Sequence, residues 1–207
     1  MQLPQPSFFL ACILALFLTA CANSSQIAPG VRVTNASTPP AAGEVKFTLR
    51  NPNPEQWTPQ IEQGARDGTV RTGYTCKVLI CPEPASVVVT RNVVRGARPD
   101  KTALEKIAKV NIPKMNEARN LELQVRSDNK AKFETLSSNT TKFGVFDSIL
   151  SETKLTVAGR SRFASVATIL AGRMIVIIRA EAGDRVTARK AVDAFAQSFT
   201  IEEGPPV

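Results

Sequence analysis

The feature that most constrains the fold is a short apolar run, Met174-Ile175-Val176-Ile177-Ile178, near the C-terminal end of the chain. Odd and even positions are both apolar, so a strand formed by this run would bury both of its faces. The preceding segment 162–170 also reads as a strand, and Ala171-Gly172 between the two is a turn signal. The sequence therefore predicts a hairpin whose second strand, over 173–180, is central in a sheet covered on both sides.

Two helices are predicted around this hairpin. Asp184 can cap a helix over 185–197. The apolar stripe of that helix has the spacing of a buried face and consists of Ala188, Ala191, Val192, Phe195 and Phe199. A shorter helix is expected after Asp100, and Pro113 is expected to end or kink it.

Further strands are expected where β-branched or alternating apolar residues recur. These candidates span 45–50, 87–94, 121–126, 132–138, 143–150 and 151–157. Residues 51–85 are rich in Pro and Gly and are expected to be mostly loop. The predicted fold is a single α+β domain over 44–203, with an antiparallel β-sheet flanked by helices.

The order of these elements from about 87 to 201, with Ser198-Phe199 after the last helix, resembles the PsbP/DcrB-like family. Many bacterial members of that family are small envelope lipoproteins. The resemblance implies a curved antiparallel sheet flanked by helices, and a binding or assembly role without catalysis. That family has no motif for active-site residues, so no residue role is carried over. The Pro-rich segment with Cys76 and Cys81 is not part of the family pattern.

The N-terminal residues form an apolar block over 8–18 that ends in Leu18-Thr19-Ala20-Cys21. This ending resembles the lipobox of bacterial lipoproteins, which implies removal of the signal peptide 1–20 and acylation of Cys21. An uncleaved membrane anchor and an ordinary secreted protein are the alternatives, because no Lys or Arg precedes the apolar block, where export signals normally carry positive charge. Ala22 favours the outer over the inner membrane, by resemblance to the sorting rule of enteric lipoproteins.

Residues 21–43 are predicted to be a lipidated, disordered tether. The segment is rich in Ala, Ser, Asn, Thr and Pro and carries a single charged residue, Arg32. Such a composition cannot bury enough apolar surface to fold. A flexible coil over 22–43 has an r.m.s. reach of about 25 Å, which would lift the domain clear of the lipid headgroups.

The cysteines beyond the tether are Cys76 and Cys81. If 76–81 were extended, their Cα atoms would lie about 16 Å apart, whereas a disulfide requires less than about 7 Å. A bridge therefore requires this segment to turn, and Pro82 and Pro84 just beyond it fit a loop. In an oxidising compartment a structural disulfide is the expected state; free thiols and a redox role are the alternatives.

The absence of histidine restricts the chemistry of this chain. It excludes Ser-His-Asp and Cys-His catalytic sites and argues against a conventional catalytic zinc site. No phosphate-binding glycine loop or paired carboxylate motif occurs. We therefore expect no enzymatic activity, no cofactor and no metal.

The chain carries a net charge of +8, with basic residues concentrated between Arg91 and Lys132. Arg91, Arg95, Arg98 and Lys101 are candidates for an anion-binding face; the alternative is an ordinary solvated surface. Nucleic acid is not expected as a partner, because this segment lacks interleaved aromatic residues for base stacking.

The only tryptophan and the only tyrosine, Trp57 and Tyr74, both fall in the segment expected to be loop. They would either form a contact surface or pack the loop onto the core.

These features together predict a lipid-anchored envelope lipoprotein whose domain faces the periplasm. Its expected function is that of a non-enzymatic accessory or binding module for an envelope protein assembly. The alternative is a binder of anionic envelope polymer or lipid through the basic face. Under either reading the lipid at the N-terminus makes the membrane a partner.

Overall fold

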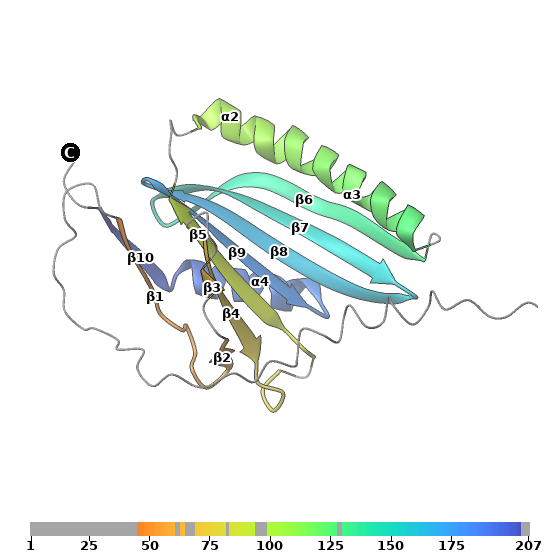
Figure 1. Cartoon of the computed structure of the whole chain (residues 1–207), viewed down its shortest axis with the longest axis horizontal. Coiled ribbons are helices and arrows are strands. Elements are labelled where there is room, and N and C mark those ends of the chain that lie inside the picture. Colours follow the sequence, from red (N-terminus) through yellow and green to blue (C-terminus); the bar gives the residue numbers. More distant parts are fainter. Residues whose placement is uncertain are drawn as a thin grey trace, which may run out of the picture. The chain divides into compact units, whose positions relative to one another are not determined.

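The computed structural model describes residues 45–60, 63–64, 69–81, 83–93, 99–127 and 130–203 (Figure 1). The predictions for the signal peptide, Cys21 and the tether lie outside the described residues. So do Arg95 and Arg98 of the predicted basic face.

Most of the described strands belong to one antiparallel sheet, in the order β2-β4-β5-β9-β8-β7-β6, with β3 paired to β4. Their bounds are β2 Trp57–Pro59, β3 Gln63–Gly64, β4 Val70–Cys76, β5 Ser86–Val93, β6 Ala131–Phe143, β7 Phe146–Val157, β8 Arg160–Ala171 and β9 Met174–Ala182. Two further strands, β1 (Val45–Leu49) and β10 (Phe199–Glu203), pair with each other in a separate two-stranded sheet. The predicted α+β class is confirmed.

Strand β9 holds the central position that its apolar sequence predicts. It pairs with β5 on one side and with β8 on the other. Met174, Val176 and Ile178 are buried on one face, whereas Ile175 and Ile177 on the other face are half-buried. The predicted hairpin turn is also present, and Gly172 occupies it with φ of 58°, a left-handed conformation that glycine adopts without strain.

Helix α4 (Arg185–Ala196) covers the buried face of β8 and β9. The predicted cap is confirmed, because the Asp184 carboxylate accepts a hydrogen bond from the Thr187 N–H at 2.8 Å. The main core lies between α4 and the sheet, and Phe195 is completely buried in it. The sequence periodicity of this helix therefore identified its packing face correctly.

The second helical segment is longer than the sequence predicted. It runs through α2 (Lys101–Lys106), a π-helical turn η1 (Ile107–Asn111) and α3 (Ile112–Arg126). Pro113 does not end it. In the wider turn the Ile112 N–H donates to the Ile107 carbonyl, five residues back. Pro113 then falls in the first turn of α3, directly after this wider turn, a position where proline is tolerated.

The strand predicted over 121–126 is therefore wrong, because these residues form the last turns of α3. Leu121 and Val125 alternate with polar residues but are exposed to solvent. The side chains that α3 directs at β6 are polar: Asn116 Nδ2 donates to Thr135 Oγ1 at 2.9 Å. The spacing of apolar residues therefore could not identify this part of the helix, because it contacts the sheet through asparagine side chains.

Two other strand predictions need correction. Segments 143–150 and 151–157 were expected to be separate strands, yet 146–157 is one continuous strand, β7. Segment 51–85 was expected to be mostly loop, yet it contains the seven-residue strand β4. Gly73 makes this segment less typical of a strand, but it allows Gln60 to pack closely. The Gln60 N–H donates to the Gly73 carbonyl at 2.7 Å. A Cβ on Gly73 would lie 3.2 Å from the Gln60 Cβ, which is a tight contact.

Candidate functional site

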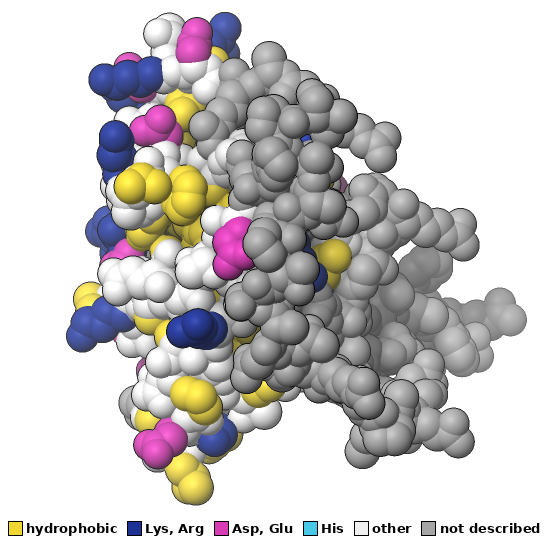
Figure 2. Space-filling model, turned by 90° about the vertical axis from the view of Figure 1, so that its left-hand side faces the viewer, with side chains coloured by type: hydrophobic (Ala, Val, Ile, Leu, Met, Phe, Trp, Pro, Cys, Tyr) yellow, Lys and Arg dark blue, Asp and Glu magenta, His cyan; other side chains and the backbone are white. Residues whose placement is uncertain are grey.

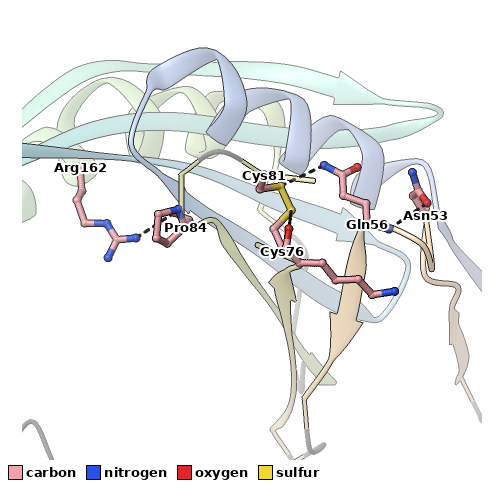
Figure 3. Close-up of a disulfide and its surroundings, with 7 residues drawn as sticks. Asn53, Gln56, Cys76, Cys81, Pro84 and Arg162 are labelled. Carbon is pink, nitrogen blue, oxygen red and sulfur yellow. Dashed lines mark hydrogen bonds between the residues drawn. A yellow bond between two sulfur atoms is a disulfide. The ribbon is translucent and has the colours of Figure 1, made fainter. Parts of the chain in front are cut away.

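The loop that follows β4 is closed by a disulfide between Cys76 and Cys81, whose Cα atoms are 6.0 Å apart (Figure 3). The chain turns between them, as a bridge requires. The Lys77 carbonyl accepts hydrogen bonds from the N–H groups of Ile80 at 2.9 Å and Cys81 at 3.0 Å. Both cysteines are buried against the main core, so the base of the loop is part of the folded domain.

The segment before β2 supports this base from the side. The Gln56 carbonyl accepts a hydrogen bond from the Lys77 N–H at 2.9 Å, and the Lys77 ammonium donates to the Pro54 carbonyl at 3.0 Å. Gln56 Nε2 also lies 3.6 Å from the Cys81 sulfur. Figure 3 shows Asn53 and Gln56 beside the disulfide, on the side opposite Arg162. The loop is thus held by its disulfide and by hydrogen bonds to the segment that precedes β2.

The tip of the loop carries three consecutive aliphatic residues that leave the core. Val78 is 87% exposed, Leu79 is 100% exposed and Ile80 is 51% exposed. We call these three residues the apolar tip. Single exposed apolar residues are common on protein surfaces, but contiguous ones mark interaction sites. The sequence predicted a turn between the two cysteines, but a turn by itself does not show whether its apolar side chains are buried or exposed.

Trp57 and Tyr74 do not belong to this surface. Both are buried and pack on Phe195 of α4, with ring centroids 5.5 Å and 4.7 Å away. The interpretation of these aromatic residues as a contact surface is wrong, and the alternative, packing onto the core, is confirmed. They contribute to the site only by anchoring the strands from which the loop projects.

The charges around the loop are mixed. Lys77 is adjacent to the apolar tip, and Arg162 of β8 donates from Nη2 to the Pro84 carbonyl at 3.2 Å. The exposed carboxylates of Glu55 and Glu83 belong to the segments that flank the base.

A second polar cluster surrounds the buried carboxylate of Glu152 in β7. It accepts hydrogen bonds from Ser137 Oγ at 2.7 Å, from Arg185 Nε at 3.2 Å and from Ser165 Oγ at 3.4 Å. The hydrogen bonds from Arg185 and Ser137 lower the pKa of Glu152 against the opposing effect of burial. Glu152 is therefore ionised at neutral pH and links α4 to the sheet, which is a structural role rather than that of a proton donor.

The two described members of the predicted basic face lie on different elements. Arg91 of β5 has its guanidinium 5.2 Å from the centroid of the Phe47 ring and lines a hollow of about 270 Å³ that includes Val70 and Met174. Lys101 begins α2 and lines a different hollow, of about 410 Å³. Figure 2 shows one face of the molecule, on which Lys and Arg side chains are spread along one edge with Asp and Glu among them. The basic face stays a prediction.

A further cavity, of about 380 Å³, is lined by Leu104, Phe146, Asp147 and Leu170, among others. Asp147 is exposed, and its carboxylate lies 3.8 Å from the Lys142 ammonium. Within the described ranges, no group of three or more Cys, Asp or Glu residues is arranged to hold a metal ion. None of the helices that the structure describes is both long enough and apolar enough to cross a bilayer.

Comparison with known proteins gives structural similarities only. No family model matches the sequence, and no curated protein matches it. The fold is similar to that of cyanobacterial PsbP (CyanoP) from Synechocystis sp. PCC 6803, with a TM-score of 0.46 and 15% identity over 81% of this chain and 98% of that one. It is also similar to LpqN of Mycobacterium tuberculosis, a protein involved in cell envelope biogenesis, with a TM-score of 0.46 and 13% identity over 77% of this chain and 85% of that one.

Proposed function

We propose that this protein is a lipid-anchored envelope lipoprotein that acts as a non-enzymatic accessory or binding module for an envelope protein assembly. The observation that carries the proposal is the exposed apolar surface of a disulfide-containing domain, chiefly Leu121 and Val125 on α3. A structural disulfide suits an oxidising compartment, and contiguous exposed aliphatic residues suit a contact with another molecule.

The N-terminal sequence supports the anchor. The lipobox-like Leu18-Thr19-Ala20-Cys21 precedes a polar, proline-containing segment that ends where the described domain begins. Acyl chains on Cys21 would hold the domain at the membrane, and two or more chains give stable attachment where one does not. Ala22 favours the outer membrane.

The chemistry of the domain supports binding rather than catalysis. The sequence has no histidine, and the Glu152 carboxylate is committed to Arg185 and two serines. By contrast, large apolar side chains are exposed on α3 as well as on the loop: Leu121 and Val125, one helical turn apart, are 58% and 81% exposed. These surfaces offer contact area without reactive groups.

Photo-crosslinking in intact cells tests the proposal. A photoreactive residue is placed at Leu121 or Val125 on α3, or at the exposed Val145 in the turn between β6 and β7. We expect a discrete crosslinked protein from one of these surfaces and none from the others, because an assembly contacts a defined face. Recovery of the protein alone from every position contradicts the accessory role.

A further inference from the structure

We propose that the apolar tip, Val78 to Ile80, inserts into the boundary between headgroups and acyl chains of the membrane. The tip would thereby provide a second, non-covalent contact that orients the domain on the bilayer. This inference rests on the lipid anchor of the proposed function and assigns a lipid ligand to the disulfide-closed loop.

The first support is the contrast in burial within six residues. Cys76 and Cys81 are buried in the main core, whereas the three aliphatic side chains between them are directed into solvent. Figure 1 shows this loop, between β4 and β5, projecting from the end of the sheet away from α2 and α3. A projecting apolar tip can enter a bilayer without displacing the remainder of the domain.

The second support is preorganisation. The disulfide and the hydrogen bonds from Ile80 and Cys81 to the Lys77 carbonyl fix the loop before it binds. A fixed loop loses little conformational entropy on binding. The internal hydrogen bonds also satisfy backbone groups that hydrocarbon could not satisfy.

The third support concerns which occupant the tip fits. All three side chains are more than half exposed, and a fluid acyl phase can solvate all of them at once without a shaped pocket. The sequence 69–82 contains two basic residues, Arg71 and Lys77, and no acidic residue. Lys77 precedes the tip in the sequence, and its ammonium donates to the Pro54 carbonyl at 3.0 Å at the base of the loop. With the tip among the acyl chains, this cation would be at the level of the anionic phosphates. The acidic residues Glu55 and Glu83 belong to the segments that flank the base of the loop. The tip itself contains no acidic residue.

The fourth support is distance. A reach of about 25 Å is an average over a flexible coil, so a tether over 22–43 that can lift the domain clear of the headgroups also lets it return to them. Binding of the tip is then an intramolecular event with a high effective concentration. A contact made by three side chains, too weak to recruit a free protein, is sufficient under these conditions.

The test uses the full chain, expressed in a bacterium that processes lipoproteins and reconstituted into vesicles of phosphatidylethanolamine and phosphatidylglycerol with brominated acyl chains. Leu79→Trp reports on the tip, and Val145→Trp, at a position that is 84% exposed in the β6–β7 turn, is the matched control. The buried Trp57 contributes the same background to both. We expect the added emission of Leu79→Trp to shift to shorter wavelength and to be quenched by the brominated lipid, while that of Val145→Trp is neither shifted nor quenched.

The remaining outcomes separate this inference from the proposed function. If the protein floats with the vesicles but Leu79→Trp is no more quenched than Val145→Trp, the anchor stands and tip insertion is refuted. Shielding of Leu79→Trp from an aqueous quencher without quenching by brominated lipid would assign the tip to a protein contact and also refute insertion. If the protein does not float at all, both the anchor and the inference fail.

Discussion

Glu152 is the residue whose surroundings decide how α4 is attached to the sheet. Its side chain is 7% exposed and contacts a partly exposed guanidinium, that of Arg185, at the start of α4. A buried carboxylate is tolerated only when its oxygens are hydrogen-bonded and its charge is compensated. Ser137 and Ser165 provide the remaining hydrogen bonds from the neighbouring strands. The cluster therefore links three strands and one helix through a single ionised group.

Glu152→Gln should lower the free energy of unfolding at pH 7 by about 2 kcal/mol, the middle of the range for a hydrogen bond to a charged group. The pKa of Glu152 in the folded state is below the ordinary value of 4.5. Its contribution is therefore complete above pH 4.5 and is lost as the pH falls through the folded-state pKa. Urea denaturation from pH 7 down to pH 3 should show the difference between wild type and variant shrinking.

The matched control is Asp193→Asn, which removes the partly exposed i,i+4 pair with Arg189. Such pairs contribute a few tenths of a kcal/mol at most. Equal destabilisation by the two variants, or a difference independent of pH, would be inconsistent with the role assigned to Glu152.

At the scale of elements, α3 and β6 depend on each other. β6 is the last strand of the sheet, and an uncovered edge is open to pairing with other chains. α3 lies along it: the Phe133 N–H donates to Asn120 Oδ1 at 2.7 Å, and the Ala131 N–H donates to Ser127 Oγ at 2.9 Å. The Arg119 guanidinium also lies 4.8 Å from the centroid of the Phe133 ring. Asn120 of α3 and its C-cap residue Ser127 thus accept hydrogen bonds from the N-terminal part of the β6 edge.

Asn120→Ala should increase hydrogen exchange of the Phe133 amide and of neighbouring β6 residues, because it leaves a buried N–H without its acceptor. We expect a loss of about 1–2 kcal/mol in the free energy of opening of this strand. Asn139→Ala, at an exposed position of the same strand, is the control. Unchanged exchange at Phe133 in the Asn120→Ala variant would show that α3 does not protect the edge.

At the scale of the whole molecule, the proposed anchor and the described domain have distinct roles. The sequence before Val45 would hold the protein at the membrane, and the folded domain would present its surfaces to a partner. Strands β1 and β10, from the two ends of the domain, pair with each other: Val45 is opposite Glu203, and Leu49 is opposite Phe199. Removing the lipid should therefore change location without changing the fold.

Growth with radioactive palmitate tests this separation. The wild-type chain should be labelled and should fractionate with membranes, whereas Cys21→Ala should carry no label, because the thiol that accepts the lipid is gone. Circular dichroism of the two purified proteins should agree over the temperature range of unfolding. Label that persists in Cys21→Ala would refute acylation at this residue.

The sequence by itself determined the features that depend on neighbouring residues. The β8–β9 hairpin, helix α4 and the caps at Asp100 and Asp184 all follow from local periodicity and local hydrogen bonding. The need for a turn between Cys76 and Cys81 follows from the length of the chain between them.

The tertiary structure alone decided the features that depend on distant contacts. Helix α3 continues through 121–126 because Asn116 and Asn120 bond to β6, although the sequence alternates like a strand. Trp57 and Tyr74 are buried because Phe195, far along the chain, packs against them. Val78 to Ile80 has the composition of a buried strand, yet the turn closed at Cys76 and Cys81 places it in solvent, because burial depends on where the rest of the chain lies.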